Sequence, residues 1–414
     1  MQVTGWSRGL EVSGGGQGVV SHAGLVLLRY LADKTGLTGG LSRALATPRI
    51  LVHDRGRVLA DLACAVADGA RVISDFRVMS DQRELFGLVA SVPTAWRTLA
   101  EIARGGARAD RRITAAVSMA RRHAWAQGVA RHGGLPGVRL ADKMLDGVVC
   151  IRLDATVTVA HSDKELAEAN FKGYGHHPLV AVCDNTGGEP LAWMLRRGSA
   201  GSNTAADHIG QADAAIAALP PGFRRKLMVT CDGAGASHAL VAHLDKLAGR
   251  RGFELTYSVG WVLGEREKAA PRLVPEHAWQ IAIDGRGEVR ERRADDACAN
   301  SSCAHRACWI EEAHVTELTG LLREGPAGDQ LAGWPETMRI FARRERPHPG
   351  AQLTLFEAAD GWRYSLWATN RPAATKGWLG QSAYLDAAHR VHARVEDAIR
   401  TGKQAGLGHF PSVL

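Results

Sequence analysis

The sequence predicts an α/β protein, with a mixed-sheet core, a helical N-terminal region and a β-rich insertion. Three stretches carry this prediction. Residues 148–160 read VVCIRLDATVTVA, in which apolar residues alternate as they do in a half-buried strand. Residues 226–248 join an apolar run, a Gly-Ala-Gly turn and a helical pattern, which indicates a strand–turn–helix unit. Residues 382–402 repeat apolar positions every three or four residues, as an amphipathic helix does.

Composition limits the class of protein. A chain of 414 residues can bury a large core, and we expect two or three domains. The net charge of +8 and a pI near 9.3 favour a polyanionic partner. Seven cysteines, an odd number, favour reduced thiols over a disulfide framework. The longest apolar run is too short to cross a bilayer and no signal peptide is recognisable, so we expect a cytoplasmic protein without a membrane partner.

The N-terminal region, residues 1–145, is predicted to be helical. Leu, Ala and Val recur in it at helical spacing, and Gly, Pro or Asp separate the helical segments. The predicted helices cover residues 22–34, 58–67, 81–89, 94–104 and 111–130.

Arginine is concentrated at the end of this region. Eight arginines stand against two acidic residues between positions 97 and 131. One interpretation is contact with DNA phosphates, which would make binding salt-dependent. The other is a solvated helix face without a partner. Under the first interpretation the candidate DNA contacts are two adjacent pairs, Arg111, Arg112, Arg121 and Arg122.

The core is predicted to comprise residues 146–260 and 381–414. We expect a polar turn over 161–175 after the first strand, and a hairpin around Asn-Thr-Gly-Gly at 185–188. Together with the helices and strands that follow, the expected order is β-β-β-α-β-α-β. The later elements of this order are strands at 178–183 and 190–195, a helix at 203–219, a strand at 226–231, a helix at 237–248 and a strand at 253–259.

Three acidic residues lie on separate elements of this predicted core. Asp154 lies in the first strand among β-branched residues, where a carboxylate is costly unless it has a partner. Asp232 ends a later strand, and Glu396 lies on the helix predicted at 382–402. Three carboxylates from separate elements suit Mg²⁺ or Mn²⁺. Two such ions, about 3.5–4 Å apart, support phosphoryl transfer on nucleic acid.

The sequence around these acids resembles the DDE transposases of bacterial insertion sequences, which have a ribonuclease H-like core. The resemblance is carried by IRLDATVTVAHSDKELAEANFKGYGHHPL, VTCDGAG and HRVHARVEDAIRTGKQAGLGHFPS. It implies that Asp154, Asp232 and Glu396 are catalytic and hold two Mg²⁺ or Mn²⁺ ions. It also implies double-stranded DNA as the partner, as terminal inverted repeats and target DNA, a homodimer in the synaptic complex, and association with the nucleoid.

A related transposase branch has the signature Y-x2-R-x3-E-x6-K on its last helix. Glu396 and Lys403 fit the second half, whereas His389 and His392 replace the Tyr and the Arg. The resemblance implies that Lys403 contacts a DNA phosphate. His392 is a candidate to hydrogen-bond a phosphate, with full charge only when it is protonated.

Residues 261–380 are predicted to form the β-rich insertion. Strands are expected at 279–283, 338–342 and 362–368, with a helix at 311–322. Seven of the eleven tryptophans fall here. Relatives of the resembled kind can hold a flipped base on an aromatic side chain of such an insertion, but filling of a local core is the preferred interpretation for any single tryptophan. Cys298, Cys303, His305 and Cys308 resemble zinc ligands in type, yet their spacing does not match a standard zinc motif.

Three functions remain open. The chain is a transposase that cleaves DNA and joins the freed 3′-hydroxyl to a target, a metal-dependent nuclease without strand transfer, or an inactive DNA-binding remnant. The basic N-terminal region and the large insertion favour the first over the second, because hydrolysis alone requires neither. The end of the chain at Leu414 motivates the third. A dinucleotide site at Gly233 and Gly235 is a weak alternative, because Asp232 would repel a pyrophosphate.

Overall fold

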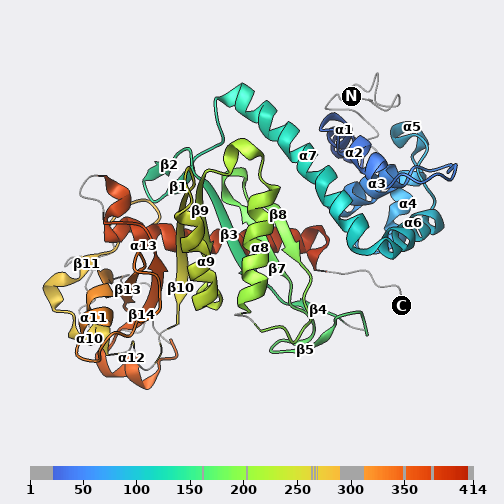
Figure 1. Ribbon diagram of the computed structural model, residues 1–414. Coiled ribbons are helices and arrows are strands. Elements are labelled where there is room, and N and C mark those ends of the chain that lie inside the picture. The colour runs from blue at the N-terminus through green and yellow to red at the C-terminus, as the bar shows by residue number, and fades with distance from the viewer. Residues whose placement is uncertain are drawn as a thin grey trace, which may run out of the picture.

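The computed structural model describes residues 22–160, 163–201, 204–262, 264, 267, 269–289, 312–347, 351–373 and 377–408. In this part of the chain a group of helices precedes a large mixed sheet. The long helix α7 (Gly106–His132) runs from the helical group to the sheet (Figure 1).

The N-terminal helices surround an apolar core that includes Phe76, Met79 and Phe86. Each of the five predicted helical segments contains a helix, although the segment 81–89 holds only one short helix, which ends at Gly87 with a φ of 69°. Two helices, α2 and α4, were not predicted. The helices before α7 are α1 (Leu25–Lys34), α2 (Leu37–Ala44), α3 (Arg55–Ala67), α4 (Arg77–Ser80), α5 (Arg83–Phe86) and α6 (Val92–Arg104).

Nine strands form the central sheet, in the order β11-β12-β13-β14-β10-β9-β3-β7-β8. Strands β3, β9 and β10 are parallel, and β7 lies antiparallel to both β3 and β8. The five core strands are β3 (Val149–Ala155), β7 (Leu179–Cys183), β8 (Glu189–Met194), β9 (Lys226–Cys231) and β10 (Glu254–Trp261). Helix α8 (Ala205–Ala218) precedes β9 and helix α9 (His238–Ala248) follows it. The predicted β-β-β-α-β-α-β order is therefore confirmed, and with it the mixed-sheet, ribonuclease H-like core.

Helices cover both faces of this core. On one face, α8 and α9 contribute to a cluster that contains Ile151, Leu153 and Val229. The other face is crossed by α13 (Ser382–Arg390) and α14 (Arg394–Gly402), which appear in red behind the strands in Figure 1. A 3-10 turn, η10 (Val391–Ala393), joins them, so the single helix predicted at 382–402 is interrupted.

The strands of the insertion continue the central sheet. Strand β14 pairs antiparallel with β10, and β13, β12 and β11 follow in turn. The elements of this part are α10 (Ala270–Leu273), β11 (Gln280–Ile281), β12 (Ala313–Glu317), α11 (Thr319–Glu324), β13 (Arg339–Glu345), α12 (Leu355–Asp360) and β14 (Arg363–Thr369). The helix predicted at 311–322 was wrong in its first half. Residues 313–317 form a strand, because Ala313 and Val315 pack with Phe341 and Trp367 on one face of the sheet.

Tryptophans of the insertion contribute to packing. Trp279, Trp362 and Trp367 are buried, and the rings of Trp261 and Trp334 lie with centroids 4.5 Å apart. Cys298, Cys303, His305, Cys308 and Trp309 lie outside the described residues.

Smaller elements lie beside the core. The polar turn expected at 161–175 contains strands β5 (Glu168–Asn170) and most of β6 (Gly173–His176), which form a three-stranded sheet with β4 (Thr158–Val159). A hairpin of β1 (Val138–Leu140) and β2 (Lys143–Leu145) connects α7 to β3. Among the described helices, none has both the length and the apolar character needed to cross a membrane.

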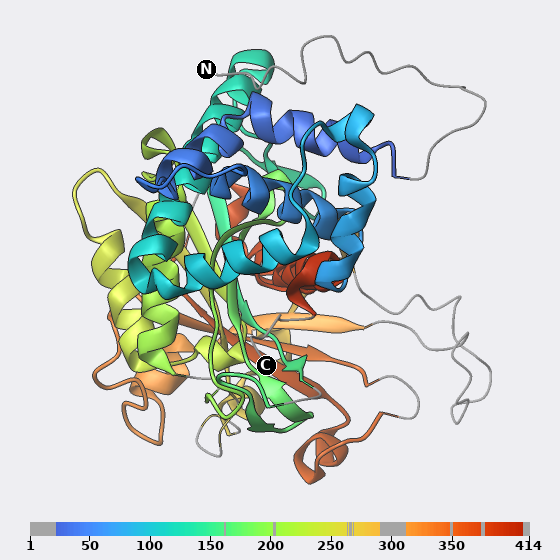
Figure 2. The ribbon, with the colours of Figure 1, turned by 90° about the vertical axis from the view of Figure 1, so that its right-hand side faces the viewer.

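The chain returns to the N-terminal helices after α14. The turn η11 (Lys403–Leu407) lies against α3, so closely that a Cβ added to Gly406 would be 2.7 Å from Cγ1 of Val66. Figure 2 shows the N-terminal helices on the side of the molecule where α14 ends. The last helix is thus in contact with both the sheet and the N-terminal region.

Candidate active site

Asp154 and Asp232 stand at the ends of neighbouring parallel strands. Leu153 of β3 pairs with Cys231 of β9, so the two aspartates occupy adjacent places one residue further along. Side chains alternate along a strand, and Leu153 and Cys231 both face the α8–α9 side. The aspartates therefore face the opposite side, which α13 and α14 cover.

The third parallel strand leaves room at this edge. Val259 of β10 pairs with Cys231, which places Gly260 beside Asp232. A Cβ added to Gly260 would lie 2.5 Å from the backbone nitrogen of Gly233, a separation that atoms do not tolerate. The absence of a side chain at Gly260 thus lets the turn after Asp232 approach β10.

Backbone amides orient both aspartates. Oδ1 of Asp232 accepts a hydrogen bond of 3.1 Å from the amide of Ala234 and thereby caps the 3-10 turn that follows. Oδ1 of Asp154 accepts one of 2.8 Å from the amide of Ala155. Among the residues that the structure describes, these bonds engage Oδ1 of each carboxylate and leave Oδ2 available to a ligand.

Glu396 reaches this edge from α14. Val395 and Ile399, on either side of it, pack against Val180 and Val182 of β7. Val180 is the residue that pairs with Asp154, so α14 crosses the sheet beside the aspartates. Glu396 itself is exposed.

The three acids interact electrostatically. Burial, together with the negative charges of Asp232 and Glu396, raises the pKa of Asp154 from 3.8 to about 7. Among the described residues, no three His, Cys, Asp or Glu side chains converge closely enough to hold one metal ion. The three carboxylates are therefore neighbours that repel one another and do not meet at a single point.

This donor set fits a divalent cation in its chemistry. All three groups offer carboxylate oxygens, the ligands that Mg²⁺ and Mn²⁺ prefer. A cation would also offset the burial and the repulsion that together raise the pKa of Asp154. For all three to coordinate, the exposed side chain of Glu396 has to turn towards the aspartates.

Lys403 lies close to the same strand. Its Nζ donates a 2.9 Å hydrogen bond to the carbonyl of Val157, three residues beyond Asp154. Burial, with a contribution from the charge of Lys172, lowers the pKa of Lys403. The amine has further hydrogens for a second acceptor.

His389 and His392 are turned into the protein. Nδ1 of His392 lies 3.0 Å from Oγ1 of Thr230, and Nδ1 of His389 lies 3.0 Å from Oγ of Ser258. Burial lowers the pKa of His392 to about 3 and that of His389 to about 4, so both rings are neutral. This corrects the expectation that His392 hydrogen-bonds a phosphate, because an enclosed and neutral imidazole neither reaches nor attracts one.

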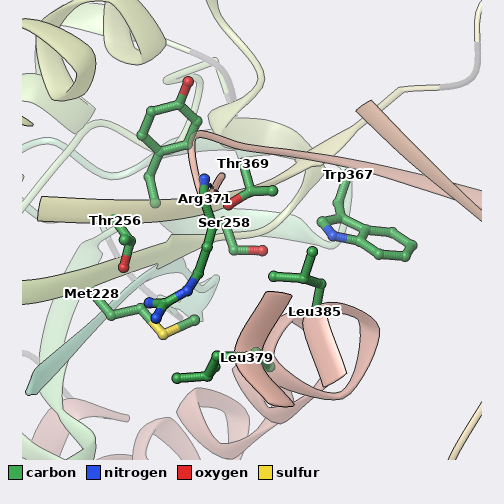
Figure 3. A pocket seen from close by; sticks show the side chains of 10 residues that line it. Met228, Thr256, Ser258, Trp367, Thr369, Arg371, Leu379 and Leu385 are labelled. Atoms are coloured by element: carbon green, nitrogen blue, oxygen red, sulfur yellow. Dashed lines mark hydrogen bonds between the residues drawn. The ribbon is translucent and has the colours of Figure 1, made fainter. Parts of the chain in front are cut away.

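A narrow crevice remains between α13 and the sheet (Figure 3). It contains none of the three acids. Ser258, which contacts His389, is one of its lining residues, with Thr256, Trp367, Arg371, Leu379 and Leu385 among the others. The crevice therefore belongs to the packing of α13 and lies apart from the aspartates.

The four candidate arginines of α7 have different environments. Arg121 is buried and donates to Glu189 at 2.6 Å and to the carbonyl of Pro190 at 2.8 Å. This corrects its assignment as a DNA contact, because its donors are used to attach α7 to the core. Arg111, Arg112 and Arg122 are exposed.

Three charged residues near Glu396 were not identified from the sequence. Asp184 accepts hydrogen bonds from the buried Arg152 of β3 and from Arg394 of α14. A cation at position 152, on the same strand face as Asp154, was the available signal. Its partner could not be identified, because Asp184 and Arg394 lie far from it in the sequence.

Comparison with known families gives one result for nearly the whole length. The family model described as transposase DDE domain group 1 matches residues 3–407. A comparison with curated proteins found no match.

Proposed function

The chain belongs to the group 1 DDE transposases, and from this premise we propose that it binds the ends of its mobile element, cuts the DNA there and joins the freed 3′-hydroxyl to target DNA. In this proposal the catalytic residues are Asp154, Asp232 and Glu396. A transposase carries out the reaction on DNA, so its place of action would be the cytoplasm, at the nucleoid.

The observation that carries the proposal is the placement of the three acids. Two aspartates end adjacent parallel strands in register, and the helix with Glu396 crosses the sheet beside them. Burial, together with the charges of Asp232 and Glu396, raises the pKa of Asp154. A protein rarely keeps such repulsion without a function for it, and perturbed carboxylates of this kind cluster at catalytic sites.

Mg²⁺ or Mn²⁺, as two ions per site, would be the cofactor. When bound, the ions activate the attacking oxygen and stabilise the leaving oxygen of a phosphodiester. The aspartates, fixed by the amides of Ala155 and Ala234, would provide the rigid part of the site. Glu396 would provide the mobile part, because its side chain is exposed on α14.

DNA contacts are proposed for the exposed cations. Arg111, Arg112 and Arg122 are open to solvent on α7, and no carboxylate pairs with them among the described residues. DNA phosphates would pair with these arginines, and the release of counterions would make binding salt-dependent. Lys403 would hold a phosphate close to Asp154, since its amine already lies beside Val157. Two copies of the chain would bring two element ends together.

Nicking of a labelled element end tests the proposal. The DNA that flanks the gene supplies candidate inverted repeats for the duplex. We expect 3′-end nicks with Mg²⁺ or Mn²⁺ that disappear in Asp154→Asn, Asp232→Asn and Glu396→Gln. Nicking of any duplex without preference for the end would indicate a nuclease instead. Binding of the end without nicking would indicate an inactive remnant.

A further inference from the structure

The continuous stretch of α13, the 3-10 turn η10 and α14, which carries Glu396, is hydrogen-bonded to one part of the sheet after another. Four of its side chains make these bonds, in the order in which the strands lie in the sheet. Asp386 bonds Arg343 of β13, His389 bonds Ser258 of β10, His392 bonds Thr230 of β9, and Arg394 bonds Asp184 after β7. The helix crosses the strands in Figure 1, so each bond fixes it at a different point along its length.

Of these four contacts, the one at Thr230 is nearest to the aspartates in the sequence, and Thr230 bonds two partners. It lies two residues before Asp232, and its Oγ1 accepts a 3.2 Å hydrogen bond from Nη1 of Arg152. An arginine can only donate, so the hydroxyl hydrogen of Thr230 is free to bond Nδ1 of the neutral His392. The contact thus links β3 and β9, the two strands of the aspartates, to the helix of Glu396.

Asp184 makes the second connection to the same strands. Its side chain is 8% exposed and receives Arg152 on one side and Arg394, at 3.1 Å, on the other. Arg394 precedes Glu396 by two residues and also donates 2.8 Å to the carbonyl of Arg139. The turn of Asp184 is itself anchored, because the side chain of Asn185 accepts from the amide of Cys150 and donates to the carbonyl of Val148.

Apolar packing alone would not fix the position of α14 along the sheet. Val395 and Ile399 attach α14 to β7 through contacts that have little directional preference. Hydrogen bonds depend steeply on distance and angle, so they define where along the sheet the helix rests. Polar groups in an apolar interface bring little net stability, and one attested role of such groups is to define a single arrangement.

We propose that Thr230–His392 and Arg152–Asp184–Arg394 are positioning contacts that hold the backbone of Glu396 where its side chain can turn towards Asp154 and Asp232 and share a cation with them. This inference rests on the proposed function, because it assigns Glu396 to the cation site. It also explains the departure from the Y-x2-R-x3-E-x6-K pattern. In this chain the position of the signature arginine is occupied by a neutral His392 that holds the helix in place.

The proposal is tested by measuring the Mn²⁺ affinity of the DNA-free, full-length protein with titration calorimetry. Thr230→Val removes the hydroxyl and keeps the shape of the side chain. Arg394→Leu removes the hydrogen bond from α14 to Asp184. We expect each to weaken Mn²⁺ binding by about 10- to 100-fold, as loss of groups that orient metal ligands does. Thr230→Ser keeps the hydroxyl and should restore the wild-type affinity.

Two matched variants separate positioning from general support. Ser258→Ala removes an equivalent hydroxyl–imidazole contact, from His389, on the far side of the 3-10 turn from Glu396. Arg400→Leu removes another exposed arginine from α14. Both should leave the Mn²⁺ affinity unchanged. If Ser258→Ala weakens binding as much as Thr230→Val, the contacts are general supports and the proposal is overturned.

The Glu396→Gln background identifies the residue through which the contacts act. Thr230→Val should have little further effect there, because the ligand that it positions is already lost. An undiminished effect would overturn the proposal. The inference alone would be overturned if the wild-type protein binds Mn²⁺ in an Asp154-dependent way and the Thr230→Val and Arg394→Leu variants bind it equally well. Wild-type protein without any Asp154-dependent Mn²⁺ binding would overturn the proposed function and the inference with it.

Discussion

Asp154 and Asp232 directly follow Leu153 and Cys231, which pair across two parallel strands, so the two carboxylates leave the sheet at the same edge and on the same face. No residue lies between them in this register. The strands that hold them are buried on both sides, which makes the pair a rigid base. A third acid has to come from outside the sheet, and α14 brings Glu396 across the same face.

Neutral replacement of either aspartate should stop DNA cleavage. We expect Asp154→Asn and Asp232→Asn to slow nicking of an element end by about 1,000-fold or more, equal to about 4 kcal/mol of transition-state stabilisation. Binding of the end should persist, because the exposed arginines are unchanged. Asp397→Asn, which alters the acid next to Glu396 on α14, serves as the control and should nick at the wild-type rate.

The pH dependence of stability follows from the raised pKa of Asp154. Between its unfolded value of about 4 and its folded value of about 7, the folded metal-free protein holds a proton that the unfolded chain has lost. The stability contributed by Asp154 is therefore present below about pH 4 and is lost as the pH rises through about 7.

Thermal unfolding with and without Mn²⁺ measures this effect. The gain in Tm from Mn²⁺ should be larger at about pH 8 than at about pH 6, because the cation must displace the proton of Asp154 at the lower pH. Asp154→Asn should raise the Tm of the metal-free protein at about pH 8, where it removes a repelling charge. A Tm gain from Mn²⁺ that does not change with pH would contradict the proposed involvement of Asp154.

The residue opposite Asp232 on β10 should not accept a side chain. In Gly260→Ala the new Cβ would lie 2.5 Å from the nitrogen of Gly233 and 2.8 Å from the carbonyl carbon of Asp232. Because backbone atoms must move, we expect a loss of stability of about 1–3 kcal/mol and slower nicking. Gly222→Ala is the control, since a Cβ there meets nothing within 4 Å. Urea unfolding and the nicking assay measure the two effects, and wild-type behaviour of Gly260→Ala would show that the turn moves freely.

The core and two of its acids could be predicted from the sequence because they depend on local patterns. Alternation places Asp154 opposite Leu153, and the strand–turn–helix pattern places Asp232 at the end of a strand. The buried stripe of the last helix was harder to predict, because only apolar residues were counted. Leu385 and Val395 belong to it and are buried, and the partly buried ring of His392 lies beside them because a hydroxyl of a distant strand bonds its nitrogen.

Long-range pairing explains the other errors. The strand Ala313–Glu317 depends on partners far away in the sequence, since it pairs with β11 and β13. The bridge from Arg152 to Arg394 through Asp184 joins three separate segments. Charge counts place arginines on α7 but do not show which of them face the core.

Arg121 and Arg122 are adjacent residues with opposite environments, and this difference gives a matched pair of variants. The guanidinium of Arg121 is enclosed and bonds Glu189, which also accepts from Nε1 of Trp125 at 3.0 Å. Arg122, about 100° further round the helix, is exposed. We expect Arg121→Met to lower the free energy of unfolding by about 2–4 kcal/mol, less than for a fully buried pair because Glu189 is partly exposed.

Arg122→Met should leave the stability unchanged and weaken DNA binding. If Arg122 contacts a phosphate, the slope of log affinity against log salt concentration should fall by about 1. Urea unfolding and salt-dependent binding of the element end measure the two effects on both variants. The salt slope of Arg121→Met should stay at the wild-type value, since its cation is already neutralised by Glu189 inside the protein. A reduced salt slope in Arg121→Met and not in Arg122→Met would mean that α7 turns over when DNA binds, because only then would the enclosed guanidinium meet a phosphate.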